Sequence, residues 1–560
     1  MRAGLRRVLA AAAMVCVSGA AVGEVLAPAG REREQFTTPP APRAQPGGPA
    51  ISLPGTVAPP GAEKVNLVVR DVRIVGSTVY TRDQLTPLYG DLIGRSVPLA
   101  AIYELARRIT AKYGADGYVL SRAIVPPQQL QPGGAVVRIE VVEGYVDEVV
   151  WPPQLQRYRD FFTADAAKIV ADRPANIRTI ERYLLLAGDL PGLKFRTTLR
   201  ASKHHPAAST LVVEVIEKPV DLLGRVDNRG TRARGPFEFL GTATLNNWLG
   251  QHEALTLTYA GVVPLKELHF AAAAYKQVLT SEGLTAFANA SYAWGRPGTP
   301  ELETLDFATR STVVEAGLAY PFIRSRERNL TLSAYGFYSD NDTDSLNAPL
   351  FRDHLRGFRV KAEADAADWF NGINQLIVTY SHGIQGLGSS LNDDPFLSRM
   401  NGRVDFNKIE AYATHLQPLV APFSALLAVY GQYSAVPLLV PEQCGYGGRV
   451  FGRAFDPSAF LGDRCFEALA ELRYDLPPKD VVSLAQLYGY VDYGNLFSIG
   501  VASATPGVPV QPSAVEAASA GAGLRLGFLE NRLTADLSVA KAIEGDPNQW
   551  RFFFILTAHN

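Results

Sequence analysis

The stretch Phe466–Asp475, with the sequence FEALAELRYD, contains the pattern that decides the fold. Small, aliphatic or aromatic side chains occupy every second position, and mostly charged side chains lie between them. The first set is Phe466, Ala468, Ala470, Leu472 and Tyr474, and the second is Glu467, Leu469, Glu471, Arg473 and Asp475. A period of two predicts a β-strand with one apolar and one polar face. Such a strand suits a wall that has lipid on one side and water on the other.

Similar alternation continues from Val220 to the last residue. Leu255, Leu257 and Tyr259 alternate with threonines, and the chain finishes with the aromatic segment WRFFFILTAHN. At about 20 residues per strand and connection, about 340 residues give about 16 antiparallel strands. Backbone N–H and C=O groups in lipid must all form hydrogen bonds, so these strands are expected to close into a transmembrane β-barrel rather than an open sheet. An array of soluble β-sandwiches is the alternative.

The first 23 residues are typical of a secretory signal peptide. Arg2, Arg6 and Arg7 precede a short apolar run, and small residues lead up to Glu24. No later apolar run reaches about 18 residues, the length expected of a membrane-spanning helix. Basic and acidic residues nearly balance, at 54 and 55. That balance argues against a nucleic-acid partner.

The region between the signal and the barrel divides into three parts. Residues 24–64 are rich in proline and predict an extended linker with room for a short plug segment at most. Residues 65–143 and 144–218 each read as a small β-α-α-β-β module, and they end in similar strands, AVVRIEVVEG and TLVVEVIEKP. The helices of these modules carry apolar faces that include Leu99, Ile102, Ile177, Ile180 and Leu184.

The sequence shows no set of residues at the spacing expected of a catalytic site. No phosphate-binding loop occurs, which argues against a nucleotide, and the pair His204–His205 before Pro206 suits exposure to solvent better than zinc binding. We therefore expect no enzyme activity, no metal and no cofactor. Cys444 and Cys465 are the cysteines beyond the signal. In an exported protein they predict a disulfide, with two buried free thiols as the alternative.

The glycine-rich loop Gly447–Phe466, GGRVFGRAFDPSAFLGDRCF, and the strand YVDYGNL at residues 490–496 carry a family resemblance. Together with the order of signal, linker, two modules and barrel, they resemble the TpsB family of outer-membrane transporters of two-partner secretion, the haemolysin-activator type. The modules resemble POTRA domains. In this family the sixth extracellular loop folds into the lumen and ends in a Val-Arg-Gly-Phe/Tyr tetrad. Here Gly452-Arg453-Ala454-Phe455 keeps the arginine and the aromatic residue and replaces the other two.

The resemblance implies that Arg453 is latched to an aspartate on the inner barrel wall. Asp492 and Gly494 fill the Asp-x-Gly positions of the partner motif. The alternation of the surrounding strand independently turns Asp492 toward the lumen, where a guanidinium finds a planar acceptor. We therefore expect a lumenal latch of Arg453, Phe455, Asp492 and Gly494. Other lumenal carboxylates remain open as partners of the arginine, namely Glu467, Glu471 and Asp475.

The resemblance also implies a function in the outer membrane of a Gram-negative bacterium. The barrel, embedded in outer-membrane lipid, would secrete an unfolded exoprotein that carries an N-terminal secretion domain. The POTRA-like modules would lie in the periplasm and bind this partner by strand addition. Leu99, Ile102, Ile177, Ile180 and Leu184 are candidate partner contacts, with core packing as the alternative for each. A barrel-assembly insertase and a passive porin are the rival functions. The final residue, Asn560, departs from the aromatic residue common in the family.

Overall fold

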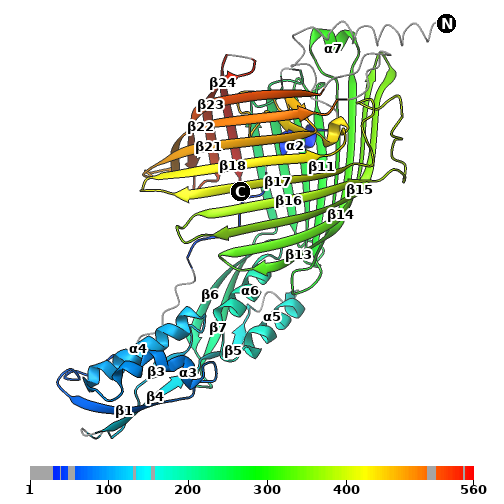
Figure 1. Ribbon diagram of the computed structural model, residues 1–560. Coiled ribbons are helices and arrows are strands. Elements are labelled where there is room, and N and C mark those ends of the chain that lie inside the picture. The colour runs from blue at the N-terminus through cyan, green and yellow to red at the C-terminus, as the bar shows by residue number, and fades with distance from the viewer. Residues whose placement is uncertain are drawn as a thin grey trace.

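The computed structural model describes residues 30–37, 39–47, 57–129, 131, 134–152, 158–231, 233–500, 512–546 and 549–560. A barrel forms one end of the molecule, and two small α+β modules extend from it in a row (Figure 1). The predicted signal peptide lies outside the described residues. No helix within the described ranges is both long and apolar enough to cross a membrane.

Sixteen antiparallel strands close the barrel, and the last strand, β25, pairs with the first, β8. The strands are β8 (Val220–Asp227), β9 (Phe237–Asn246), β10 (Glu253–Val263), β11 (His269–Val278), β12 (Thr285–Gly295), β13 (Ala308–Arg324), β14 (Arg328–Ser345), β15 (Ala348–Ala367), β16 (Ile373–Gly383), β17 (Asn407–Pro418), β18 (Phe423–Ser434), β21 (Arg464–Leu476), β22 (Val482–Ser498), β23 (Ser513–Phe528), β24 (Leu533–Glu544) and β25 (Trp550–His559). The prediction of a closed barrel of about 16 strands is confirmed. Asn560 contributes to closure, because its side-chain oxygen accepts the Leu222 N–H at 2.9 Å.

Burial follows the alternation predicted from the sequence. On β21, Phe466 and Leu472 are both 52% exposed toward the lipid side, whereas Glu467 and Glu471 are each only 2% exposed inside the barrel. The wall has unequal height, since β13, β14 and β15 run for 17, 18 and 20 residues but β8 for only 8. A membrane crossing needs about 9–11 residues, so the long strands project well beyond the hydrocarbon.

The first module packs the four-stranded sheet β2-β1-β4-β3 against helix α4. Its elements are β1 (Asn66–Val75), α3 (Arg82–Leu85), η1 (Thr86–Leu88), η2 (Gly90–Leu92), β2 (Ser96–Pro98), α4 (Leu99–Ala115), β3 (Arg122–Ile124) and β4 (Ala135–Val142). Ile102 on α4 has no exposed surface, and Leu99 packs partly buried against the same core. The expectation that Ile102 contacts a partner is therefore wrong, because the residue completes the hydrophobic core.

The second module packs helices α5 and α6 on the three-stranded sheet β5-β7-β6. Its elements are β5 (Tyr145–Val150), α5 (Arg159–Ala171), α6 (Ile177–Gly188), β6 (Leu193–Ala201) and β7 (Ala208–Glu217). Asn176 caps α6, since its side-chain oxygen accepts the Arg178 N–H at 3.0 Å. β6 is a sheet edge that pairs only with β7 among the described strands.

Residues 30–37 and 39–47 lie in the interior of the barrel and include the short helix α2 (Glu32–Phe36) (Figure 1). At one end the Arg31 side chain donates to the Ser458 hydroxyl at 3.1 Å. At the other end the Gln45 N–H donates to the Arg326 carbonyl, in the turn between β13 and β14, at 2.8 Å. The segment predicted as a linker thus lies inside the barrel along part of its length, with one short helix of five residues.

Candidate functional site

The connection between β18 and β21 folds into the lumen as a hairpin. Its stem pairs β19 (Cys444–Tyr446) with β20 (Phe460–Gly462), and η4 (Val440–Glu442) precedes it. A disulfide joins Cys444 to Cys465 on β21, with Cα atoms 6.5 Å apart, as the sequence predicted. At the tip, Gly452 adopts φ +64°, and a Cβ there would lie 2.7 Å from the Gly447 nitrogen. The tip can therefore reverse this tightly only with glycine at position 452.

Arg453 at the tip forms an ion pair with Glu471 and not with Asp492. Its Nη1 lies 2.6 Å from Glu471 Oε2, and its guanidinium carbon lies 4.5 Å from the Tyr490 ring centroid. Asp492 instead accepts the backbone N–H of Arg453 at 3.2 Å. The predicted side-chain pairing with Asp492 is wrong, and Glu471, one of the alternatives left open, is the partner.

The physical reason is that Asp492 is already occupied by hydroxyl donors. Tyr446 and Ser519 each donate a hydroxyl to Asp492 Oδ1 at 2.6 Å. Glu471 lies directly opposite Tyr490 in the register of β21 and β22, one inward-facing position further along the wall than Asp492. The guanidinium therefore crosses the Tyr490 ring to reach the neighbouring strand.

Glu471 is the most heavily paired carboxylate of this latch. Besides Arg453 it contacts Arg473 and Arg525, each at 2.8 Å, and it is only 2% exposed. Charge-assisted hydrogen bonds of this kind are stronger than neutral ones, and loss of the shared Glu471 carboxylate would remove an acceptor from all three arginines at once. One carboxylate thus joins the loop tip to strands β21 and β23.

Phe455 and Gly494 complete the latch through packing. Phe455 is 2% exposed, with its ring centroid 5.2 Å from Phe460 and 5.8 Å from Tyr446. A Cβ on Gly494 would lie 2.4 Å from the Tyr446 ring. Glycine at position 494 therefore lets the hairpin lie directly against β22. The structure brings the four predicted latch residues together, although the Arg453 side chain pairs with Glu471 instead of Asp492.

Three arginines that the sequence did not single out also hold the hairpin. Arg229 donates to the Arg453 carbonyl at 2.7 Å, and Arg551 pairs with Asp456 at 2.6 Å. Arg449 contacts Asp227 at 2.8 Å and also pairs with Glu238. Arg229 follows the first barrel strand and Arg551 lies on the last, so only closure of the barrel places them beside the loop.

The interior residues 30–37 and the hairpin contact each other and the wall. The Arg449 side chain donates to the Gln35 carbonyl at 3.1 Å, and the buried pair Arg234–Glu32 is 2.7 Å long. Arg33 pairs with Glu315 on β13 at 2.8 Å. The interior is therefore occupied by two chain segments that polar contacts hold in place. Within the part of the chain that the structure describes, no cluster of metal-binding side chains occurs.

A groove of about 790 Å³ lies between α6 and the edge strand β6 of the second module. Ile177, Ile180 and Leu184 line its helical side, as the sequence placed them on one face, and Phe195 and Leu199 line its strand side. Ile180 is only 3% exposed and belongs mainly to the core, whereas Ile177 and Leu184 are partly exposed. Arg43, Gln45, Arg324 and Arg326 border the groove on the barrel side.

The second module contacts the barrel through the turn between β11 and β12. Glu282 in this turn accepts the Tyr183 hydroxyl at 2.8 Å and pairs with Arg182 at 3.3 Å. Asp165 on α5 lies near this contact, is 1% exposed, and its Oδ1 has no hydrogen-bond partner among the described residues. Burial, and to a smaller extent the nearby Glu282 carboxylate, raises the pKa of Asp165 to about 8.

Comparison with known families explains this architecture. A model of the ShlB-type POTRA domain matches residues 67–144, and a model of the haemolysin secretion/activation protein ShlB/FhaC/HecB matches residues 208–526, more than half of the chain. The chain belongs to this family. It is a TpsB-type transporter of two-partner secretion in the outer membrane, with its POTRA domains in the periplasm. The comparisons support secretion rather than barrel assembly or passive diffusion through a porin.

Individual members of the family are similar over most of the chain. The outer membrane transporter CdiB of Dickeya dadantii (strain 3937) is 23% identical over 467 residues, covering 77% of this chain and 76% of that protein. The heme/hemopexin transporter protein HuxB of Haemophilus influenzae (strain ATCC 51907 / DSM 11121 / KW20 / Rd) is 23% identical over 487 residues, covering 83% and 81%. The solved structure of CdiB from Escherichia coli shares the fold, with a TM-score of 0.69, 18% identity, and coverage of 91% of this chain and 94% of that one.

Proposed function

We propose that this transporter secretes an unfolded exoprotein through its barrel and that the hairpin tip latches the channel in its resting state. In this proposal, residues 65–143 and 144–218 are the periplasmic POTRA domains and residues 219–560 form the barrel. The partner enters through its own N-terminal secretion domain. The observation that carries the proposal is the buried attachment of Arg453 to Glu471 in the lumen of a closed barrel.

The partner is captured by strand addition at β6. This strand has one side without a pairing strand among the described residues, so its backbone N–H and C=O groups can pair with an extended segment. Backbone pairing accepts many sequences, which suits a client whose side chains vary. The groove beside β6 offers apolar contacts from Ile177 and Leu184 to alternate side chains of the added strand.

Passage of a chain requires the interior to clear. The hairpin contacts the inner wall through Arg453 and Glu471, and residues 30–37 contact it through Arg33 and Glu315. The two segments contact each other through Arg449 and the Gln35 carbonyl. Displacement of either segment removes contacts from the other. The latch therefore couples the two segments that fill the lumen.

The experiment is photocrosslinking in cells that produce the transporter together with its exoprotein. A photoreactive residue replaces Thr197, on the groove side of β6, or Arg107 on the exposed face of α4 as the matched control. Crosslinks to the exoprotein from position 197 but not from position 107 support capture at β6. Equal crosslinking from both positions contradicts it, and secretion that continues in cells lacking the transporter contradicts the function itself.

A further inference from the structure

The tall wall formed by β13, β14 and β15 carries a polar cluster on its outer surface. Outward-facing residues of β14 change along the strand from apolar to acidic. The sequence of outward side chains is Leu330, Leu332, Ala334, Tyr338, Asp340, Asp342 and Asp344. Tyr338 marks the change, at the level where an interfacial aromatic residue is expected. The acidic positions therefore lie just beyond the hydrocarbon, on the side of the barrel away from the POTRA domains.

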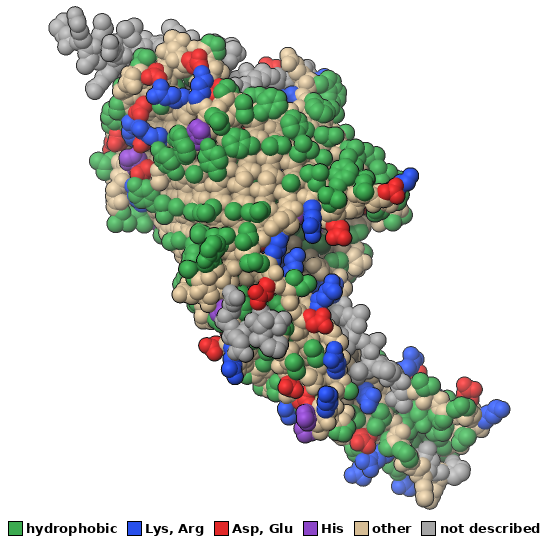
Figure 2. All heavy atoms as spheres, turned by 180° about the vertical axis from the view of Figure 1, so that it is seen from behind, with side chains coloured by type: hydrophobic (Ala, Val, Ile, Leu, Met, Phe, Trp, Pro, Cys, Tyr) green, Lys and Arg blue, Asp and Glu red, His purple; other side chains and the backbone are tan. Residues whose placement is uncertain are grey.

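Basic residues flank these aspartates on both neighbouring strands. In the register of the sheet, Arg310 of β13 and Arg352 of β15 lie directly opposite Asp342 on either side. Seen from behind, blue and red side chains gather at the far end of the barrel, beside a band of hydrophobic side chains (Figure 2). The charged cluster thus borders the lipid-facing surface.

A cavity of about 350 Å³ lies within this cluster. Its charged lining consists of Arg296, Arg310 and Arg352 with Asp306 and Asp344, and Asp342 pairs with Arg352 beside it. The three guanidinium groups come from three separate segments. Arg296 lies in the loop that follows β12, Arg310 lies on β13 and Arg352 lies on β15. Arginines that converge from different segments on one cavity suit an anion with several oxygens, such as a phosphate group, better than a single carboxylate.

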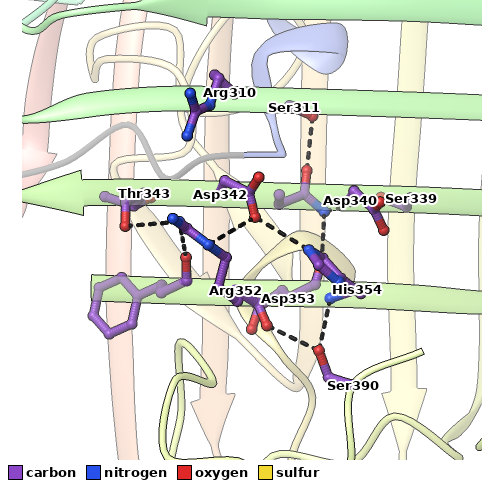
Figure 3. A network of polar contacts seen from close by, with 12 residues as sticks. Arg310, Ser311, Ser339, Asp340, Asp342, Thr343, Arg352, Asp353, His354 and Ser390 are labelled. Atoms are coloured by element: carbon purple, nitrogen blue, oxygen red, sulfur yellow. Dashed lines mark hydrogen bonds and ion pairs between the residues drawn. The ribbon is translucent and has the colours of Figure 1, made fainter. Parts of the chain in front are cut away.

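Asp306 and Asp344 hold two of the arginines in position, and each of these arginines keeps N–H donors that do not contact its aspartate. Arg296 contacts Asp306 through Nη1 at 2.9 Å, and Arg310 contacts Asp344 through Nη2 at 2.7 Å. These two arginines are 63% and 50% exposed, so their other N–H groups are accessible. The Arg352 side chain lies between β14 and β15 and points toward Asp342 and the Thr343 carbonyl (Figure 3).

We propose that this cavity binds the phosphate group of an outer-leaflet glycolipid such as lipid A. The cavity opens on the outer surface directly beyond the aromatic level, where lipid headgroup phosphates lie. Arginine recognises phosphate through paired N–H donors, and partly buried aspartates fix the guanidinium orientation before binding. The site lies outside the lumen and does not depend on the secretion mechanism.

The test uses the purified full-length transporter in detergent and native mass spectrometry with diphosphoryl lipid A. The variant Arg296→Ala/Arg310→Ala removes two exposed guanidiniums, and Arg328→Ala, at the opposite end of β14, is the matched control. We expect lipid A retention to fall about tenfold in the double variant and to stay unchanged in the control. Equal retention by the double variant and the unaltered protein would overturn the proposal, provided that heat-modifiable gel mobility shows both barrels folded.

Two further arms identify the source of the phosphate. Dephosphorylated lipid A should be retained about tenfold less than the diphosphoryl form by the unaltered protein. Inorganic phosphate at millimolar concentration should leave lipid A retention unchanged. Equal retention of the two lipids would show that the site does not recognise phosphate. Displacement of lipid A by inorganic phosphate would show that the site binds free anions instead of a lipid.

Discussion

Two arginine–carboxylate clusters of the same barrel differ in burial and therefore in consequence. In the lumen, Glu471 is 2% exposed and contacts three arginines. On the outer rim, Arg310 is 50% exposed and contacts Asp344 through one nitrogen. Breaking a buried pair leaves a charge without compensation, at a cost of about 3–5 kcal/mol, whereas exposed pairs contribute about 0–1 kcal/mol. The first cluster therefore holds the hairpin in place, and the second is free to exchange partners.

The largest effect is expected from the lumenal cluster. Glu471→Gln should weaken attachment of the hairpin by about 3–5 kcal/mol, because Arg453 loses its carboxylate. Arg453→Ala should cost less, about 1.5–3 kcal/mol, because Glu471 keeps Arg473 and Arg525, and the double variant should be little worse than Glu471→Gln alone. Hydrogen exchange of residues 447–459 in the detergent-purified protein measures this attachment. Arg310→Ala on the rim is the control, and additive effects of the two lumenal changes would show that the pair is not coupled.

Removing the disulfide should have the next largest effect. Cys444→Ser with Cys465→Ser opens the covalent link between the hairpin stem and β21. For a loop of this length the link is worth about 3 kcal/mol, so the temperature at which the barrel unfolds on a gel should fall. An unchanged unfolding temperature, together with mass spectrometry proving the bond intact in the parent protein, would show that the stem is held by packing alone.

A smaller, pH-dependent effect is expected outside the membrane, in the second POTRA domain. The folded pKa of Asp165 is about 8, above its ordinary value of 3.8, so between these values the folded state holds a proton that the unfolded state has released. The free energy of unfolding should therefore be highest below about pH 4 and fall as the pH rises to about 8. Asp165→Asn should remove this dependence and stabilise the domain at pH 8 by about 1–3 kcal/mol.

Hydrogen exchange of α5 and α6 across this pH range measures the prediction for Asp165. Asp160→Asn, at an exposed position on the same helix, serves as the control. A domain whose protection is the same at pH 5 and pH 8 would contradict a protonated, buried Asp165.

The smallest effect on the stability of the barrel is expected from a substitution in the exposed cluster on the outer rim. Arg310→Ala should change the unfolding temperature of the barrel only slightly, because an exposed pair contributes about 0–1 kcal/mol. Secretion should also stay at the level of the unaltered protein. A loss of folded barrel from this variant would show that the exposed ion pairs on the rim stabilise the barrel as strongly as the buried lumenal pairs do.

The sequence predicts the barrel well and the latch only in part. Lipid forces closure and strict alternation, so the inward position of Glu471 and Asp492 follows from local pattern. Which of the two receives Arg453 depends on the hydroxyls of Tyr446 and Ser519, which come from the hairpin and from β23. Arg229 and Arg551 escape prediction for a similar reason, because barrel closure brings the first and last strands to the hairpin. Ile102 could not be assigned from the sequence either, because an apolar helical face looks the same whether it packs in the core or contacts a partner.

Secretion by the Arg453→Ala transporter tests the central claim most directly. The measurement compares exoprotein in the culture medium with exoprotein retained in the periplasm, at equal amounts of folded barrel in the outer membrane. We expect an inserted barrel with secretion reduced about tenfold or more, because Arg453 holds the hairpin, and through Arg449 the segment at Gln35, in the arrangement from which passage begins. Undiminished secretion from an inserted barrel would contradict the role assigned to the arginine at the hairpin tip.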